Sequence, residues 1–155
     1  MQRRELRFST LSEVQADLKK LASTSYSSVA KWDLSQVAEH LADWMTFPIE
    51  GYPKNPWIVS ILIRVMRVTQ GKSLYTKFVR NQRMATGQPT ILATVYPENA
   101  SSEKSVERLL TALDRLSEFR GALQPSPLFG ELSYDEVVAL QLAHCAHHLS
   151  FLVPN

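Results

Sequence analysis

Helix-start signals recur along this chain, and they constrain its fold more than any other feature. Three pairs of residues have capping-box spacing, in which two side chains exchange hydrogen bonds with the first turn of a helix: Thr10 with Glu13, Asp33 with Gln36, and Ser133 with Glu136. Apolar residues recur with a helical period over five segments, at about 11–22, 34–47, 56–70, 102–119 and 134–152. No two segments alternate as paired strands do. The sequence therefore predicts an all-α fold, an antiparallel bundle of four long helices preceded by one short helix.

Glycine and proline mark where the predicted helices end. The run from Pro48 to Pro53 follows the second helix, and Gly71 follows the third. Helical periodicity then fails between residues 72 and 99, where we expect a long loop with an extended piece at 90–96. A loop of this length in a compact domain is usually functional or mobile.

Length and composition limit the class of protein. A chain of 155 residues is expected to form one domain, residues 1–155, with a core large enough to fold without a disulfide. Its one cysteine, Cys145, excludes an internal disulfide and suits a reducing compartment. The charged N-terminus lacks the apolar core of a signal peptide, and the longest apolar stretch, residues 57–63, is too short to span a bilayer. We therefore expect a cytoplasmic protein with no membrane partner.

Charge is unevenly distributed along the chain. Seven basic and no acidic residues lie between residues 51 and 97, although the net charge of the whole chain is only +2. Such a segment can attract an anionic substrate, a cofactor or a phosphate backbone. Because no aromatic-basic array or nucleic-acid motif accompanies it, we favour bases that face solvent and expect no nucleic-acid partner.

Three of the four histidines lie in the last predicted helix, within a stretch of five residues: His144, His147 and His148. The fourth, His40, lies in the second predicted helix. Neutral imidazole is the commonest side-chain metal ligand near neutral pH. Histidines at i and i+4 project from the same side of a helix. A third imidazole from a neighbouring helix would complete a three-nitrogen face with an open coordination position, as in catalytic metal sites.

The apolar stripe of the last helix indicates which histidines converge. The stripe includes Cys145, and at about 100° per residue His144 and His148 flank it within about 40° of each other. His147 lies about 160° from Cys145 and is expected to point to solvent. His40 lies at the shoulder of the apolar face of its own helix. We therefore predict a half-buried metal site at the edge of the bundle, with His40, His144 and His148 as ligands.

Other chemistries have less support. The pattern His-x-x-His-His lacks the glutamate of the zinc-protease signature, because Cys145 stands in its place. Cys145 lies in the centre of the apolar stripe, which favours a small core residue over a nucleophile. No glycine-rich phosphate loop is present. Three unrelated histidines, each bonded to water or to carbonyls, remain the alternative to a metal site.

Two stretches resemble motifs of the DinB/YfiT-like metalloprotein superfamily. The stretch from Trp32 to Leu41 is similar to its second-helix motif, in which a tryptophan and a small polar residue precede the helix bearing the first metal-binding histidine. The stretch from His144 to His148 resembles its last-helix motif, whose first and last histidines are ligands. Three further segments are similar to a bacterial family of unknown function within that superfamily: residues 3–8, 127–133 and 147–152.

The resemblance implies an up-down-down-up four-helix bundle in which His40, His144 and His148 bind a divalent ion, zinc or nickel. Superfamily members with known activity are thiol-dependent transferases or isomerases that use mycothiol, bacillithiol or glutathione, and many members are dimers. For this chain the resemblance therefore implies a low-molecular-weight thiol as partner and a homodimer. The exposed-looking aromatic residues of the middle segment are candidates for the dimer interface: Tyr52, Trp57 and Tyr75.

Two functional hypotheses follow. The first is a metal-dependent thiol transferase or hydrolase, whose basic segment and loop 72–99 would cover the site and attract the carboxylates of a thiol. The second is a non-catalytic metal-binding or stress-related interaction module, because no residue near the histidines is an evident general base. Asp43 is the candidate to hold His40 by a hydrogen bond. Three imidazoles by themselves suit zinc, nickel, copper and iron.

Overall fold

The computed structural model describes residues 2–84, 94–97 and 102–155. These residues form five helices, α1 (Leu11–Ser23), α2 (Leu34–Glu50), α3 (Trp57–Asn81), α4 (Ser102–Glu118) and α5 (Tyr134–Leu149). Two short strands, β1 (Tyr26–Ser28) and β2 (Leu152–Pro154), pair antiparallel. The chain is mostly helical, as the sequence predicts. The small sheet was not predicted, because strands of three residues are too short to show alternation.

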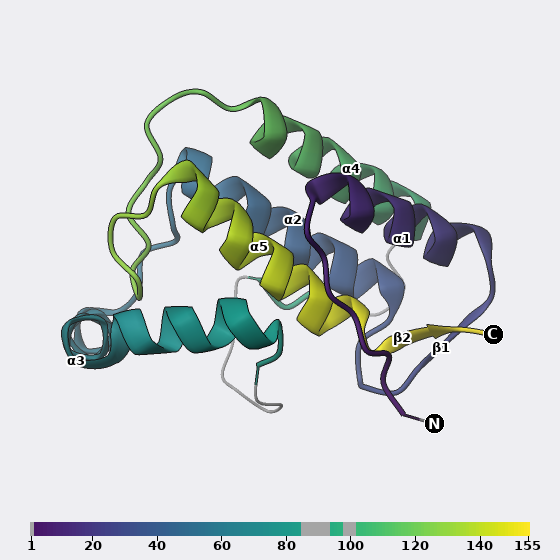
Figure 1. Ribbon diagram of the computed structural model, residues 1–155, viewed down its shortest axis with the longest axis horizontal. Helices are drawn as coiled ribbons and strands as arrows, with labels where there is room; N and C mark the ends of the chain where they lie inside the picture. The colour runs from purple at the N-terminus through teal and green to yellow at the C-terminus, as the bar shows by residue number, and fades with distance from the viewer. Residues whose placement is uncertain (1, 85–93, 98–101) are drawn as a thin grey trace.

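The core lies between α1, α2, α4 and α5 (Figure 1). Each of these helices contributes fully buried leucines: Leu18, Leu41, Leu113 and Leu149. The first helix, expected only to precede the bundle, is thus a full member of the core. By contrast, Gly71 is the one buried residue of α3, which packs mainly along α5 and lies at the edge of the core. The core is therefore built by α1, α2, α4 and α5, and not by the four long helices that the sequence predicts.

Two of the three predicted capping boxes are confirmed. The side chains of Asp33 and Ser133 accept hydrogen bonds from the third residue of α2 and α5, and the reciprocal bonds are present. At α1 the hydroxyl of Thr10 accepts from the Glu13 amide, but the Glu13 carboxylate accepts from Ser9 instead of Thr10. These caps fix where the helices that carry the histidines begin.

The predicted ends of two helices are wrong. α2 continues through Pro48 to Glu50 and stops at Gly51, whose backbone φ of 113° few other residues tolerate. α3 continues through Gly71 to Asn81, so residues 72–81 are helix and not loop. A Cβ at position 71 would lie 2.9 Å from the carbonyl oxygen of Leu128. That glycine therefore permits a close contact between α3 and the 121–133 linker and does not end the helix.

The rest of the predicted loop is only partly described. Residues 94–97 are described and contain no strand, whereas residues 85–93 and 98–101 of the expected loop and extended piece lie outside the described residues. α5 ends at Leu149, earlier than predicted, and the chain turns directly into β2. Among the described helices, none combines the length and the apolar character needed to cross a membrane.

The N-terminal segment holds the end of α5 in place. The Arg4 guanidinium donates two hydrogen bonds to the Asp17 carboxylate, at 2.7 and 2.8 Å, and a third to the carbonyl of Leu149. The Arg4 amide also donates to the Ser150 carbonyl. Helix ends leave carbonyls without partners, so the arginine both pairs with α1 and satisfies the last turn of the helix that carries three histidines.

Candidate metal centre

Three histidines from two helices meet in the interior. His40 projects from α2, and His144 and His148 project from α5 one turn apart. One ring nitrogen of each lies within 4.8 Å of the others, and the Nε2 atoms of His40 and His144 are 3.3 Å apart. The three residues that the sequence brings forward as ligands therefore form one cluster.

The spacing of the cluster fits a metal ion. Two imidazole ligands of a tetrahedral zinc ion, with Zn–N bonds of about 2.1 Å, lie about 3.4 Å apart. The 3.3 Å separation of the His40 and His144 Nε2 atoms agrees with that value. Among the described residues, the group contains no fourth histidine, cysteine, aspartate or glutamate. A bound ion would therefore have a coordination position that no histidine, cysteine or carboxylate of the described residues fills.

Burial keeps the imidazoles neutral, which is the form that binds metals. It lowers the pKa of His40 to about 4, although a hydrogen bond to Thr94 and the charge of Asp43 oppose the shift. Burial, together with the neighbouring histidines, holds the pKa values of His144 and His148 well below their usual range. At neutral pH each of the three residues is therefore neutral and has one ring nitrogen with a lone pair that a metal ion can bind.

Two tryptophans hold the imidazole rings in place. Trp32, just before α2, stacks on His148 with the ring planes 11° apart and the centroids separated by 5.6 Å. Trp44, one turn after His40, meets His144 edge to face at 5.1 Å. Aromatic pairs at such distances fix ring orientation as well as excluding water. His40 and His144, at 1% and 7% exposed, lie deeper than the half-buried edge site that the sequence predicts, whereas His148 is partly buried.

The remaining nitrogen of His40 is engaged by Thr94. Its Nδ1 lies 3.2 Å from the Thr94 carbonyl oxygen and 3.1 Å from the hydroxyl. A carbonyl only accepts, so this contact favours the tautomer in which Nδ1 donates and Nε2 carries the lone pair. Metal-binding histidines commonly have such a partner, which fixes the tautomer and the ring orientation. Thr94 therefore directs the Nε2 lone pair of His40 toward the other two histidines.

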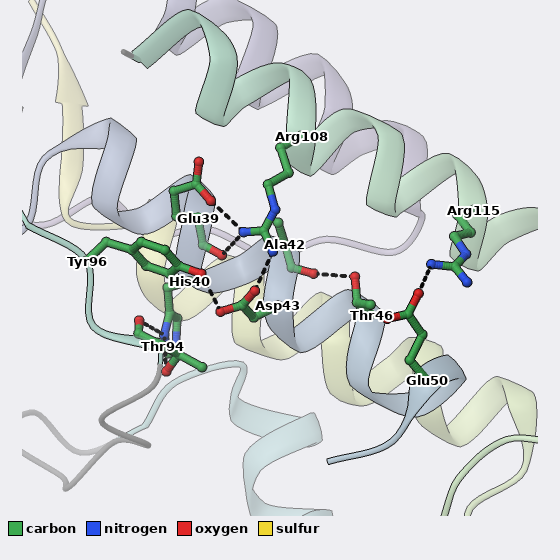
Figure 2. Close-up of polar contacts among 10 residues, drawn as sticks. All are labelled: Glu39, His40, Ala42, Asp43, Thr46, Glu50, Thr94, Tyr96, Arg108 and Arg115. Atoms are coloured by element: carbon green, nitrogen blue, oxygen red, sulfur yellow. Dashed lines mark hydrogen bonds and ion pairs between the residues drawn. The ribbon is translucent and has the colours of Figure 1, made fainter. Parts of the chain in front are cut away.

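Residues 94–97, which we call the strap, are hydrogen-bonded to α2, which is in turn paired with α4 (Figure 2). The Tyr96 hydroxyl donates to Asp43 at 2.8 Å, and Gln36 donates to the Tyr96 carbonyl at 2.7 Å. Arg108 of α4 pairs with both Asp43 and Glu39. Asp43 was expected to bond His40 directly. Its hydrogen bonds instead go to Tyr96 and Arg108, so it acts on His40 through its charge and through the strap.

The strap yields a test of its own. We expect Tyr96→Phe to weaken metal binding about 10-fold, the lower end of what partners of ligands contribute. The change removes one of the hydrogen bonds that hold Thr94 against His40, and it should also lower the free energy of unfolding by about 1 kcal/mol. Titration with a competing chelator and urea unfolding measure the two effects.

Tyr134→Phe is the matched control for this test. It deletes another tyrosine hydroxyl, which donates to the Leu116 carbonyl away from the cluster. It should cost similar stability and leave metal affinity unchanged. Equal loss of metal affinity in both variants would show that the strap has no role in orienting His40.

His147 is buried, and its predicted orientation toward solvent is wrong. It is 7% exposed, and its Nδ1 accepts a hydrogen bond from the Met84 amide at 3.1 Å. Burial, followed by the charge of Arg3, lowers the pKa of His147 to about 4. His147 is on the side of α5 opposite the apolar stripe, but other parts of the chain cover that side. His147 nevertheless stays outside the three-histidine group.

Gln141 was missed by the sequence argument. In a regular helix the carbonyl of Trp44 would accept from the amide of residue 48, but Pro48 has no N–H. The Gln141 side chain donates to that carbonyl at 2.8 Å from within the core, where it is 1% exposed. This bond joins α2 to α5 one turn from the ligands. No local signal in the sequence indicates this bond, because Pro48 follows the predicted helix at 34–47 and only the fold brings Gln141 to Trp44.

Cys145 occupies the core, as predicted. It is fully buried, and burial raises the pKa of its thiol far above the usual range. It is therefore neither a nucleophile nor a ligand of the cluster. The carboxylates of Glu39 and Asp43 next to His40 are paired with Arg108. No carboxylate from the described part of the chain joins the cluster as a free base.

Five of the seven basic residues of the middle segment lie on α3. Four of them line an open hollow of about 640 Å³ along that helix: Arg67, Lys72, Lys77 and Arg80. None of them belongs to the histidine cluster. The expected cover of the site by basic residues is thus not seen in the described part of the chain. The described residues of the predicted loop that contact a ligand include Phe78, whose ring meets His144 edge to face at 6.5 Å, and Thr94 of the strap.

Comparison with known proteins adds one finding. A family model described as "Protein of unknown function (DUF1569)" matches residues 1–155. No curated protein and no solved structure matches the chain.

Proposed function

The chain belongs to the DUF1569 family, and we propose from its geometry that it binds one divalent metal ion through His40, His144 and His148. The observation that carries this proposal is the cluster of three buried imidazoles whose ring nitrogens lie within 4.8 Å of one another. His40 already bonds Thr94 and lies within hydrogen-bonding distance of His144, and a shared ion would accept a lone pair from all three imidazoles at once. The resemblance to the DinB/YfiT-like superfamily supports the same ligands, the same kind of bundle and zinc or nickel as the ion.

We propose further that the site serves a thiol transferase in preference to a hydrolase. When bound, such an ion would act as a Lewis acid that lowers the pKa of a thiol or water at its open position. A hydrolase would also use a general base, but the carboxylates beside His40 are paired with Arg108. A thiol needs no separate base once it is ionised. Because Cys145 is buried and protonated, that thiol would come from a low-molecular-weight cosubstrate.

The chain's own residues would position the reactants. The Thr94 contact orients His40, and the stacked Trp32 and edge-on Trp44 fix the other two imidazoles and exclude water on their side. Exclusion of water strengthens electrostatic interactions at the site.

A spectroscopic titration tests the proposal. Cobalt-substituted protein should develop a near-ultraviolet sulfur-to-metal charge-transfer band when glutathione, bacillithiol or mycothiol is added. Thiol-dependent consumption of an electrophile should accompany the band. His144→Gln, which removes one ligand, should show neither. A metal-loaded protein with no thiol-induced band and no activity on thiol, ester or amide substrates would contradict the transferase and favour a non-catalytic metal-binding module.

A further inference from the structure

The first part of α3 exposes an apolar face that nothing in the described chain covers. Within residues 57–70, which we call the arm, seven large apolar side chains are exposed, and six of them form this face: Trp57, Ile58, Ile61, Leu62, Val65 and Val68. Trp57 is 72% and Val68 is 78% exposed. At about 100° per residue these six side chains fall within an arc of about 140° on one side of the helix. The arc contains no charged residue.

The opposite side of the arm faces its own chain. Ile63, Met66 and Arg67 are partly buried, and Ile63 and Arg67 lie near Pro127 of the 121–133 linker. Gly71, at the end of the arm, is packed against the Leu128 carbonyl. Figure 1 shows the two parts of α3 running in different directions, with one part seen end-on and the other lying alongside α5. The arm is therefore held against the linker with its apolar face turned outward.

The size of the face matches half of a specific interface. Side chains of these types expose on the order of 100 Å² each at such fractions, so the face presents about 600 Å² of apolar surface. This area is at the upper end of the range for the largest exposed apolar patch of an ordinary monomer. Two such faces together would bury about 1,200 Å², which is where stable, specific interfaces begin.

The spacing of the face favours a helix as its partner. Ile58, Ile61, Val65 and Val68 follow the three-four-three spacing of a helix–helix seam, flanked by Trp57 and Leu62. Stiff β-branched side chains suit packing against another helix. Among the described residues, the other exposed large apolar side chains lie outside this face: Val59 on another side of the arm, and Met84 and Val95 beyond it. The surface that best complements this face is therefore the same face of a second copy.

We propose that two copies of the chain associate through the arm, each presenting this face to the other across a two-fold axis. Such an isologous contact uses one patch twice and closes on itself. The basic side chains of Arg64 and Arg67 lie beside the face and toward the linker, so they do not enter the seam. Of the three aromatic residues expected in a dimer interface, only Trp57 takes part. Tyr52 is largely buried and Tyr75 donates to the Glu136 carbonyl. This proposal is independent of the metal site.

Light scattering on the full chain tests the arm. The native protein should show twice the 17.6 kDa of one chain at tens of micromolar. Ile61→Lys and Val65→Lys should each halve that mass, because they place like charges in an apolar seam. Gln70→Lys, which adds the same charge on the far side of the same helix, should remain a dimer. Circular dichroism melting should show all three variants folded, since the substituted side chains are exposed.

Three results would overturn the proposal. One is a native protein with the mass of a single chain. Another is a dimer that survives both Ile61→Lys and Val65→Lys, which would place the interface on a different face. The third is a native monomer that binds phosphatidylserine vesicles through the arm, in which case the apolar face and its flanking arginines would serve an anionic membrane surface.

Discussion

Replacing His40, His144 or His148 by alanine should each reduce affinity for zinc or nickel by more than about 100-fold, beyond the effect of losing a residue that merely supports a ligand. The three imidazoles come from two helices and meet at one point, with 3.3 Å between the Nε2 atoms of His40 and His144. Two of them alone would leave half of a tetrahedral ion's positions to water. Competition with a chromophoric chelator measures the affinity of each variant.

His147→Ala is the matched control for the ligand variants. It removes a buried imidazole from the same helix, next to His148, but from outside the cluster. It should keep the full metal content while lowering the free energy of unfolding by about 2 kcal/mol, because it leaves a cavity and frees the Met84 amide. If His147→Ala lost the ion and His148→Ala retained it, the ligand set would have to be rebuilt around His144 and His147.

The metal-free protein should lose stability steeply as the pH falls from about 6.5 toward 5, the range just below the ordinary histidine pKa. The folded-state pKa values of His40 and His147 are lowered to about 4, and those of the other two histidines are also lowered. At a pH between the folded-state and unfolded-state pKa values, the unfolded chain binds protons that the folded chain excludes. Each such histidine therefore removes roughly 1.4 kcal/mol of stability per pH unit as the pH falls.

Urea unfolding of chelator-treated protein at several pH values between 7 and 5 measures this slope. Most carboxylates titrate lower, so the window reports mainly on histidines. His147→Gln should make the slope shallower by one proton. A free energy of unfolding that stays constant from pH 7 to 5 would contradict the burial of neutral imidazoles on which the metal site depends.

Local sequence signals predicted the parts of the fold that are set by local chemistry. Asp33 and Ser133 cap the two histidine-bearing helices where expected, because a cap depends on residues only three positions apart. His144 and His148 share a side of α5 because helical period alone puts them there. Their meeting with His40 was predicted from its position at the shoulder of the second helix, and the cluster has that composition.

Contacts between distant segments could not be predicted in the same way. The glycine at position 71 predicts a helix end from the sequence. In the structure it leaves room for the Leu128 carbonyl, which is far away in sequence and would clash with a Cβ. His147 reads as exposed, but the segment after α3 covers it. Thr94 belongs to the extended piece that the sequence predicts at 90–96, and only the fold brings it to His40. In each case a tertiary neighbour overrides a correct local pattern.

Elemental analysis of the protein, purified without an affinity tag and dialysed against zinc or nickel, tests the central claim most directly. We expect one divalent ion per chain in the native protein and in His147→Ala, and almost none in the alanine variants of His40, His144 and His148. A native protein that retains no ion after dialysis, or one whose ion content is unaffected by loss of these three histidines, would contradict the account.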